Sequence, residues 1–239
     1  MCEKCGCGDV QHVSIEVHQS LLAENDRQAA HLRQHFEQDG VLAVNVMGSP
    51  GAGKTALLEA IALAVAGRLR LAAVSGDLAT ALDAERLERA GIASASISTG
   101  SGCHLDARMV HEALHDPRLG TAARSADVFF IENVGNLVCP AIYDLGQAVN
   151  VVVLSVTEGV DKPLKYPVMF RKADLVVLSK IDLLPYLPGV SLATLTDNVA
   201  RVMPLAQVIA LSAIGGAGVA EFAGWLDAQR AAARGGHMQ

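Results

Sequence analysis

Three cysteines lie within the first seven residues of the chain, in the sequence MCEKCGCGD. Cys2, Cys5 and Cys7 can supply three thiolates close together, and thiolates favour soft or borderline metal ions. A C-x-x-C redox pair is the alternative, but such a pair accompanies a βαβ unit and lacks a third cysteine two residues further on. Metal binding is therefore favoured, and a terminal amine or backbone nitrogen would complete a planar site suited to nickel.

A glycine-rich loop of the form G-x-x-x-x-G-K-T occurs as GSPGAGKT. It follows an expected strand and precedes an expected helix, which is the context in which this pattern binds nucleotide phosphates. Its backbone amides surround phosphate oxygens, Lys54 reaches the terminal phosphates and Thr55 ligates magnesium. A glycine-rich turn with a coincidental lysine is disfavoured by that context. The predicted phosphate-binding residues are Gly48, Ser49, Pro50, Gly51, Ala52, Gly53, Lys54 and Thr55.

Two later loops, SKID and LSAIGGAG, resemble the guanine-reading loops of GTPases. Asp182 would accept hydrogen bonds from the guanine amino group and ring NH, whereas adenine offers no matching pair of donors. Lys180 would cover the ring, and the backbone of Ala213, beside Ser212, would meet the guanine carbonyl. Ser179 stands where the usual Asn-Lys-x-Asp motif has asparagine, so we expect weaker base contact or loop bracing there. An ordinary strand end is the alternative for SKID, and its register with the phosphate loop favours the guanine reading.

Two acidic residues at strand ends are candidates for a hydrolytic site together with Lys54. Glu132 ends the apolar run DVFFIE and begins ENVG, which resembles the Asp-x-x-Gly switch of GTPases with a longer acid. The amide of Gly135 would then sense the γ-phosphate. Asp77, in SGDLAT, is a candidate for magnesium binding or for orienting water. A carboxylate that is merely solvated is the alternative for each acid.

Cys103 and His104 are adjacent in TGSGCHLDA, and Cys139 follows the proposed switch glycine Gly135 by four residues. Thiolate and imidazole together suit zinc or nickel. Buried small hydrophobic residues are the alternative for isolated cysteines, but the nearby switch favours an inner metal site. Six further histidines are predicted to be mostly surface or packing residues: His12, His18, His31, His35, His111 and His115.

Short β-rich runs alternate with helical segments along most of the chain. The predicted strands cover 41–47, 71–75, 127–132, 149–155, 174–179 and 207–212. This alternation indicates an α/β fold with a mostly parallel sheet and helices on both faces. Apolar residues at helical intervals predict one or two exposed helices over 12–39, and a last helix is expected over 218–233.

The composition limits the class of protein. The chain has 239 residues, is 51% hydrophobic and carries a formal net charge of -6. We expect a flexible metal-binding tail over 1–11 and one P-loop domain with a helical lead-in over 12–239. The charge argues against nucleic-acid or anionic-membrane partners, and no apolar run has the length of a membrane span. Five cysteines, an odd number, fit free thiols in the reducing cytoplasm.

The combined motifs resemble those of the HypB family, the nickel-handling GTPases of [NiFe]-hydrogenase maturation. The resemblance covers nearly the whole chain, and CHLDA and ENVGNLVCP are its most specific parts. It implies a three-layer α/β/α P-loop fold and a homodimer formed on GTP or metal binding. It implies a HypA-type nickel accessory protein and a hydrogenase large subunit as partners. The resemblance places a tail nickel site at Cys2, Cys5 and Cys7, and a nickel or zinc site near the two-fold axis at Cys103, His104 and Cys139.

Three departures from relatives qualify this resemblance. The histidine-rich stretch of some members is missing, and Arg108 stands where some have a further histidine, which argues against a second bridging metal ion. GDLAT replaces the GDQQT of some members but retains Asp77 and Thr80. A urease-accessory nickel GTPase, a non-enzymatic nickel or zinc buffer, and an ATP-driven carrier stay open as alternatives. The implied cofactors are GTP or GDP with magnesium, and nickel or zinc.

Overall fold

All described strands form one parallel sheet in the order β3-β2-β4-β1-β5-β6-β7. The computed structural model describes residues 9–77, 80–100, 102–117, 119–205 and 207–235, with side chains from residue 20 onward. The strands are β1 (Leu42–Gly48), β2 (Leu71–Asp77), β3 (Ala93–Ser98), β4 (Val128–Glu132), β5 (Val149–Ser155), β6 (Leu175–Ser179) and β7 (Gln207–Leu211). The central strands are buried except for the half-buried Asn150 of β5, because helices cover both faces of the sheet.

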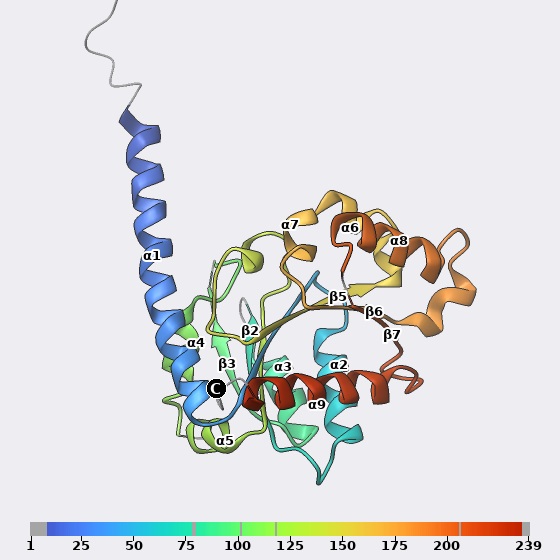
Figure 1. Cartoon of the computed structure of the whole chain (residues 1–239), viewed down its shortest axis with the longest axis horizontal. Helices are drawn as coiled ribbons and strands as arrows, with labels where there is room; N and C mark the ends of the chain where they lie inside the picture. The colour runs from blue at the N-terminus through green and yellow to red at the C-terminus, as the bar shows by residue number, and fades with distance from the viewer. Residues whose placement is uncertain (1–8, 78–79, 101, 118, 206, 236–239) are drawn as a thin grey trace, which may run out of the picture.

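The helices form two layers around this sheet (Figure 1). Along β1, Val44 and Val46 pack into the core beneath α2, α3 and α9. Ala43 and Met47 face the opposite side, which α1, α4, α5, α7 and α8 cover. The α-helices are α1 (Asp9–Gln38), α2 (Lys54–Ala64), α3 (Leu82–Arg89), α4 (Ala107–Ala113), α5 (Gly120–Ser125), α6 (Lys162–Lys165), α7 (Pro167–Phe170), α8 (Leu192–Val202) and α9 (Val219–Gly235). Three short 3-10 helices are η1 (Cys139–Ala141), η2 (Val156–Glu158) and η3 (Ile181–Tyr186).

The lead-in predicted over 12–39 is a single helix, α1. It begins at Asp9, so residues 9–11 of the predicted tail belong to the helix, and residues 1–8 lie outside the described part of the chain. The second half of α1 packs on the body through Ala29, Leu32 and Phe36, whereas its first half projects away from it (Figure 1). Among the described helices, none combines the length and apolar content needed to cross a bilayer.

Six strands were predicted from the sequence and all six are present, so the α/β/α architecture is confirmed. The seventh strand, β3, was not predicted. Its sequence ASASIS alternates small and polar residues, and it lies at the sheet edge beside β2, where only partial burial is required. Its weak apolar signal follows from that edge position.

Candidate nucleotide and metal sites

The phosphate loop joins β1 to α2 at the carboxyl edge of the sheet, where ligands bind in open α/β folds. Gly53 has a φ of 95°, in the left-handed region that glycine adopts at little cost. A Cβ added to Gly48 would lie 2.4 Å from the carbonyl oxygen of Val153, so a side chain has no room there. The glycines of GSPGAGKT therefore serve both a tight turn and the close approach of β5.

Lys54, the first residue of α2, is buried in this loop. Its Nζ lies 3.4 Å from the carbonyl oxygen of Gly48 and 3.3 Å from that of Ser49. Burial lowers the pKa of the Lys54 ammonium, and the negative charge of Glu132 opposes this shift. The long carbonyl bonds hold the ammonium inside the loop, where phosphate oxygens would be much stronger acceptors.

Thr55 and Glu132, predicted from separate motifs, are in direct contact. The Thr55 hydroxyl donates to Glu132 Oε1 at 2.7 Å. Burial raises the pKa of Glu132 to about 7, against the opposing effects of the Thr55 hydrogen bond and the Lys54 charge. Glu132 Oε2 is buried without a hydrogen-bond partner among the described residues. This orphaned oxygen beside a threonine hydroxyl suits magnesium, which prefers oxygen ligands.

A cavity of about 450 Å³ lies over the phosphate loop and brings most of the predicted catalytic residues together. Lys54, Thr55, Asp77 and Glu132 all line it. The carboxylate of Asp77 accepts a hydrogen bond from the Thr80 hydroxyl. The predicted hydrolytic residues thus surround one space, although they come from three different strand ends.

Arg86 also lines this cavity, and the sequence did not identify it. Its guanidinium donates to both carboxylate oxygens of Glu59 at 3.0 and 2.6 Å, and to Asp83 at 3.3 Å. The Glu59 hydrogen bond is the largest cause of a raised pKa for Arg86. The signal available in the sequence was weak, because Arg86 is one of two arginines on the polar helix that follows the Asp77 strand.

The SKID loop braces the phosphate loop. Ser179 is buried and its hydroxyl donates to the carbonyl oxygen of Ala52 at 2.6 Å. Lys180 has a φ of 60°, the only positive value among described non-glycine residues, and its Nζ donates to the carbonyl oxygen of Gly51 at 2.6 Å. Ser179 therefore provides the bracing that was expected to be weaker without asparagine.

Asp182 and Ser212, from the two predicted base-reading loops, are hydrogen-bonded to each other. The Ser212 hydroxyl donates to Asp182 Oδ1 at 2.5 Å and accepts from the Gly215 amide at 2.9 Å. Asp182 is exposed, whereas Ser212 is buried and followed by the half-buried Ala213. The parallel pairing of β6 with β7 brings these loops side by side, with Asp182 at the surface.

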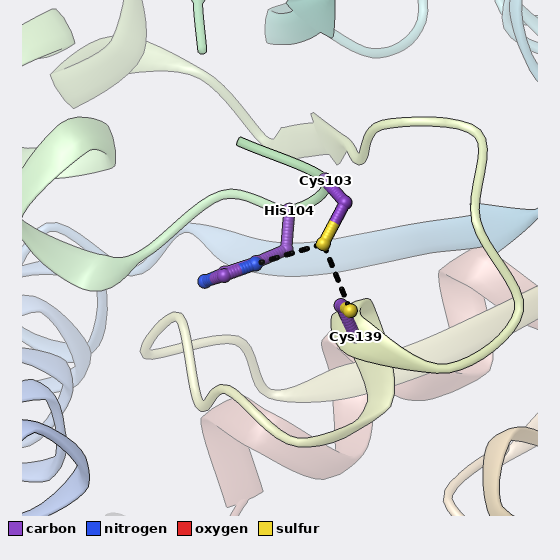
Figure 2. Close-up of side chains that lie close together, drawn as sticks. All are labelled: Cys103, His104 and Cys139. Carbon is purple, nitrogen blue, oxygen red and sulfur yellow. Dashed lines mark hydrogen bonds between the residues drawn. The ribbon is translucent and has the colours of Figure 1, made fainter. Parts of the chain in front are cut away.

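Cys103, His104 and Cys139 converge at a second site (Figure 2). The Cys103 Sγ lies 2.8 Å from the Cys139 Sγ and 3.7 Å from the His104 Nδ1. One donor atom from each residue lies within 4.8 Å of the others. Two thiols and an imidazole fit zinc or nickel, and they leave a four-coordinate ion one ligand short.

Local packing prepares the imidazole of this site for metal binding. The His104 ring stacks on Tyr143, with ring centres 3.9 Å apart and planes 18° from parallel. Burial lowers the pKa of His104, against the charge of Asp106, and so favours the neutral imidazole that binds metals. The hydrogen bond from Cys103, followed by burial, raises the pKa of the Cys139 thiol. Tyr143 was not predicted, because only its ring stacking distinguishes it from other aromatic residues.

Asp106 fixes the chain after His104. Its side chain accepts a hydrogen bond from the Met109 amide at 2.7 Å and so caps the start of α4. An aspartate at this position satisfies a backbone donor that the helix leaves unpaired. The metal-binding loop is therefore anchored to a helix immediately beyond its histidine.

Asn133 connects the two sites and was not predicted. Its Oδ1 accepts hydrogen bonds from the amides of Leu105 at 3.2 Å and Val134 at 3.0 Å. Its Nδ2 donates to the side chain of Asn45 at 3.3 Å. Asn133 lines the nucleotide cavity, and Leu105 directly follows His104. One buried side chain thus joins the end of β4 to the metal-binding loop.

The switch segment makes a second connection between the sites. A Cβ added to Gly135 would lie 2.8 Å from the backbone of Pro50, so this glycine permits close contact with the phosphate loop. The Asn136 amide donates to the Gly48 carbonyl at 3.2 Å, and Cys139 follows three residues later. The chain therefore runs from the phosphate loop directly to Cys139, a candidate metal ligand.

The tail cysteines Cys2, Cys5 and Cys7 lie outside the described residues. Their predicted grouping as a nickel site stays a prediction.

Known proteins resemble this chain over most of its length. The family model described as "CobW/HypB/UreG, nucleotide-binding domain" matches residues 42–210. The hydrogenase maturation factor HypB of Rhizobium leguminosarum bv. viciae is 47% identical over 227 residues, which cover 94% of this chain and 73% of the relative.

Two solved structures share the fold at 37% sequence identity. HypB from Archaeoglobus fulgidus has a TM-score of 0.79, and the match covers 87% of this chain and 100% of that chain. HypB from Helicobacter pylori in complex with nickel has a TM-score of 0.82, covering 87% of this chain and 95% of that chain.

Proposed function

Since the chain belongs to the HypB family of hydrogenase maturation factors, within the CobW/HypB/UreG nucleotide-binding proteins, we propose that it is a nickel-binding GTPase that couples GTP hydrolysis to metal delivery during [NiFe]-hydrogenase maturation. The observation that carries this proposal is the continuous path between the two sites. Glu132 and Asn133 line the nucleotide cavity, and the same segment ends at the metal ligand Cys139. A change at the phosphates therefore has a short covalent route to the metal.

GTP and GDP occupy the cavity over the phosphate loop in this proposal. The loop Gly48–Thr55 and Gly135 surround the phosphates, while Lys180, Asp182, Ser212 and Ala213 read the guanine. The hydrogen bonds from Ser179 and Lys180 to the phosphate loop support this assignment, because they fix the base-reading loop relative to the phosphates. Aspartate is the acceptor that distinguishes guanine from adenine at this position.

Magnesium would be held by Thr55 and Asp77, with Glu132 beside them. The fit rests on the unpartnered buried Oε2 of Glu132 and on the two other oxygen donors lining the same cavity. When bound, magnesium neutralises negative charge on the phosphates. Lys54 stabilises the charge that develops on the terminal phosphate, Glu132 holds the Thr55 hydroxyl in place, and Asp77 orients the attacking water.

The inner site at Cys103, His104 and Cys139 takes nickel or zinc, and the tail cysteines Cys2, Cys5 and Cys7 take nickel. Because the inner set is one ligand short of four, the further ligand comes from water or from a second protomer at a two-fold interface. We propose that GTP or metal binding promotes this homodimer. A HypA-type accessory protein and the hydrogenase large subunit are the proposed partners, in the cytoplasm, where thiols stay reduced.

The test is to measure GTP turnover by the purified chain together with nickel and zinc binding in the GDP and GTP-analogue states. We expect slow intrinsic hydrolysis of about 10⁻⁴ to 10⁻² per second, as in unassisted GTPases. We also expect inner-site affinities that differ between the nucleotide states. A metal buffer on a nucleotide-binding fold would show no turnover and equal affinities, and preference for ATP would indicate an ATP-driven carrier.

A further inference from the structure

Four histidines on two neighbouring helices form a cluster away from the sites described above. His31 and His35 lie one turn apart on α1, and His111 and His115 lie one turn apart on α4. The anchored half of α1 runs alongside α4 (Figure 1). These four belong to the six histidines predicted to be mostly surface or packing residues, and the fold brings the two pairs into one histidine cluster.

The spacing within the first pair suits a shared metal ion. The Nε2 atoms of His31 and His35 lie 3.2 Å apart. Two imidazole nitrogens bound about 2.0 to 2.1 Å from one tetrahedral ion are about 3.3 to 3.4 Å apart. The two side chains therefore already have a chelating geometry. Without a metal ion, one hydrogen bond between the two Nε2 atoms of neutral imidazoles maintains this geometry.

The second pair faces the first across the helix contact. The ring centres of His31 and His111 are 5.6 Å apart, and those of His111 and His115 are 4.8 Å apart. No three of the four described imidazoles have donor nitrogens within 4.8 Å of one another, so binding of one ion by more than a pair requires ring rotation, for which the exposed His31, His35 and His115 have room. His35, His111 and His115 also line one small cavity of about 80 Å³.

The charge balance around His111 favours the metal-binding form. Burial, followed by the charges of His115, His31 and His35, lowers the pKa of His111, while Glu112 opposes the shift. Asp39 and Arg124 lie at the same small cavity and contribute one charge of each sign. Neutral imidazole is the form that ligates metals, and the lowered pKa of His111 favours that form at this one position.

We propose that His31, His35, His111 and His115 form a third metal site, which binds a divalent late transition ion such as nickel or zinc and links α1 to α4. Imidazole nitrogens suit these ions, whereas magnesium and calcium prefer oxygen ligands. The all-nitrogen donor set distinguishes this site from the thiolate-containing sites. A metal ion bound there would fix the C-terminal half of α1 against α4. The N-terminal end of α1 leads to the cysteine tail.

The test uses the full chain with all five cysteines changed to serine, titrated calorimetrically with Ni²⁺ and Zn²⁺. We expect one ion to bind. His31→Gln/His35→Gln and His111→Gln/His115→Gln should each weaken binding by at least about tenfold, since loss of even an outer-shell partner of a metal ligand costs about 10- to 100-fold. Circular dichroism checks folding, and the wild-type chain alkylated with iodoacetamide serves as a second thiol-blocked preparation.

The matched control is His12→Gln/His18→Gln, which removes two imidazoles from the same helix at a spacing of six residues that cannot chelate one ion. This control should bind as tightly as its parent. Absence of binding in both thiol-blocked preparations, or equal weakening by the control, would overturn the proposal. A loss caused by the α1 pair alone would reduce it to a single-helix chelate and contradict the link to α4.

Discussion

Asn133 Oδ1 accepts a hydrogen bond from the Leu105 amide at 3.2 Å, which ties the residue after Glu132 to the residue after His104. The two residues are 28 positions apart in sequence, and each adjoins a member of a different site. Asn133 is buried, so this bond is shielded from competing water. The end of β4 is therefore held directly against the loop that carries Cys103 and His104.

Replacing this side chain should weaken the coupling between the sites. Asn133→Ala leaves the buried Leu105 amide without its acceptor, which should lower the free energy of unfolding by about 1 to 3 kcal/mol. The difference in inner-site metal affinity between GDP and GTP-analogue states should become smaller without vanishing, because the segment from Gly135 to Cys139 still joins the sites, and by linkage the effect of metal on nucleotide affinity should fall equally. Metal titrations in both states measure this. Asn198→Ala is the matched control, because Asn198 is a buried asparagine on α8 that bonds to the Val160 carbonyl and lines neither the nucleotide cavity nor the cysteine and histidine cluster. A variant that keeps the full nucleotide effect would exclude this route.

Removal of the phosphate-loop ammonium should abolish hydrolysis. Lys54→Ala eliminates the buried positive charge of the loop, and without it the charge developing on the terminal phosphate is not compensated. A phosphate-release assay measures the turnover. Lys172→Ala, which removes an exposed lysine after α7, should leave the rate unchanged. Turnover at the wild-type rate in Lys54→Ala would show that the phosphate-loop assignment is wrong.

The raised pKa of Glu132 predicts that the free energy of unfolding of the nucleotide-free protein falls as the pH rises. Because burial raises the pKa of this group from 4.5 to about 7, the folded state binds the proton more tightly than the unfolded state. The resulting stabilisation is complete below about pH 4.5 and is lost as the pH rises through about 7. At about 1.4 kcal/mol per pKa unit, the loss is at most about 3.5 kcal/mol.

Glu132→Gln removes this titration. Urea unfolding at several pH values should show the stability of the variant rising relative to wild type between pH 4.5 and 7, and then remaining level. Glu88→Gln, at an exposed position on α3, supplies the comparison. Parallel stability curves for wild type and Glu132→Gln would contradict the assignment.

Base choice should depend on Asp182. Asp182→Asn replaces one acceptor oxygen by an NH₂ donor, which opposes a donor of guanine but matches the additional carbonyl of xanthine. Loss of a charge-assisted hydrogen bond costs about 1.5 to 3 kcal/mol, or about ten- to a hundredfold in GTP affinity. Competition between GTP and XTP for binding measures the change in base preference. Asp197→Asn, an exposed site on α8, should retain the GTP preference, and retention by Asp182→Asn would mean that SKID does not read the base.

Substitutions in the two thiol sites should have different effects. Serine at Cys2, Cys5 and Cys7 should remove the tail nickel site and leave GTP hydrolysis intact, since the tail precedes every nucleotide motif. Serine at Cys103 and Cys139 should instead weaken the inner site and any metal effect on hydrolysis. Equilibrium nickel titration and turnover, measured on both variants, distinguish the sites. Equal nickel affinity before and after the tail substitutions would exclude the tail from tight binding.

The features predicted from the sequence are those encoded by residues close together in the chain, whereas features formed by contacts between distant segments were missed. The buried strands carry continuous apolar runs, so six were predicted, whereas the edge strand Ala93–Ser98 lacks such a run. The phosphate loop was predicted because its residues are consecutive. Asn133, Arg86 and the four clustered histidines were missed, because their partners lie one or more elements away in sequence. Their roles depend on tertiary packing, which periodicity does not encode.

An all-parallel sheet has no hairpins, so every neighbouring pair of strands must wait for an intervening crossover before it can form. The phosphate loop depends on late elements in this order. Val153 packs against Gly48, and the bond from Ser179 to Ala52 spans 127 residues. During synthesis, the loop motif therefore leaves the ribosome long before its supports. The nascent chain should acquire nucleotide affinity only after β6 and the loop containing Ser212 have emerged, so the site matures well after its own phosphate loop has been synthesised.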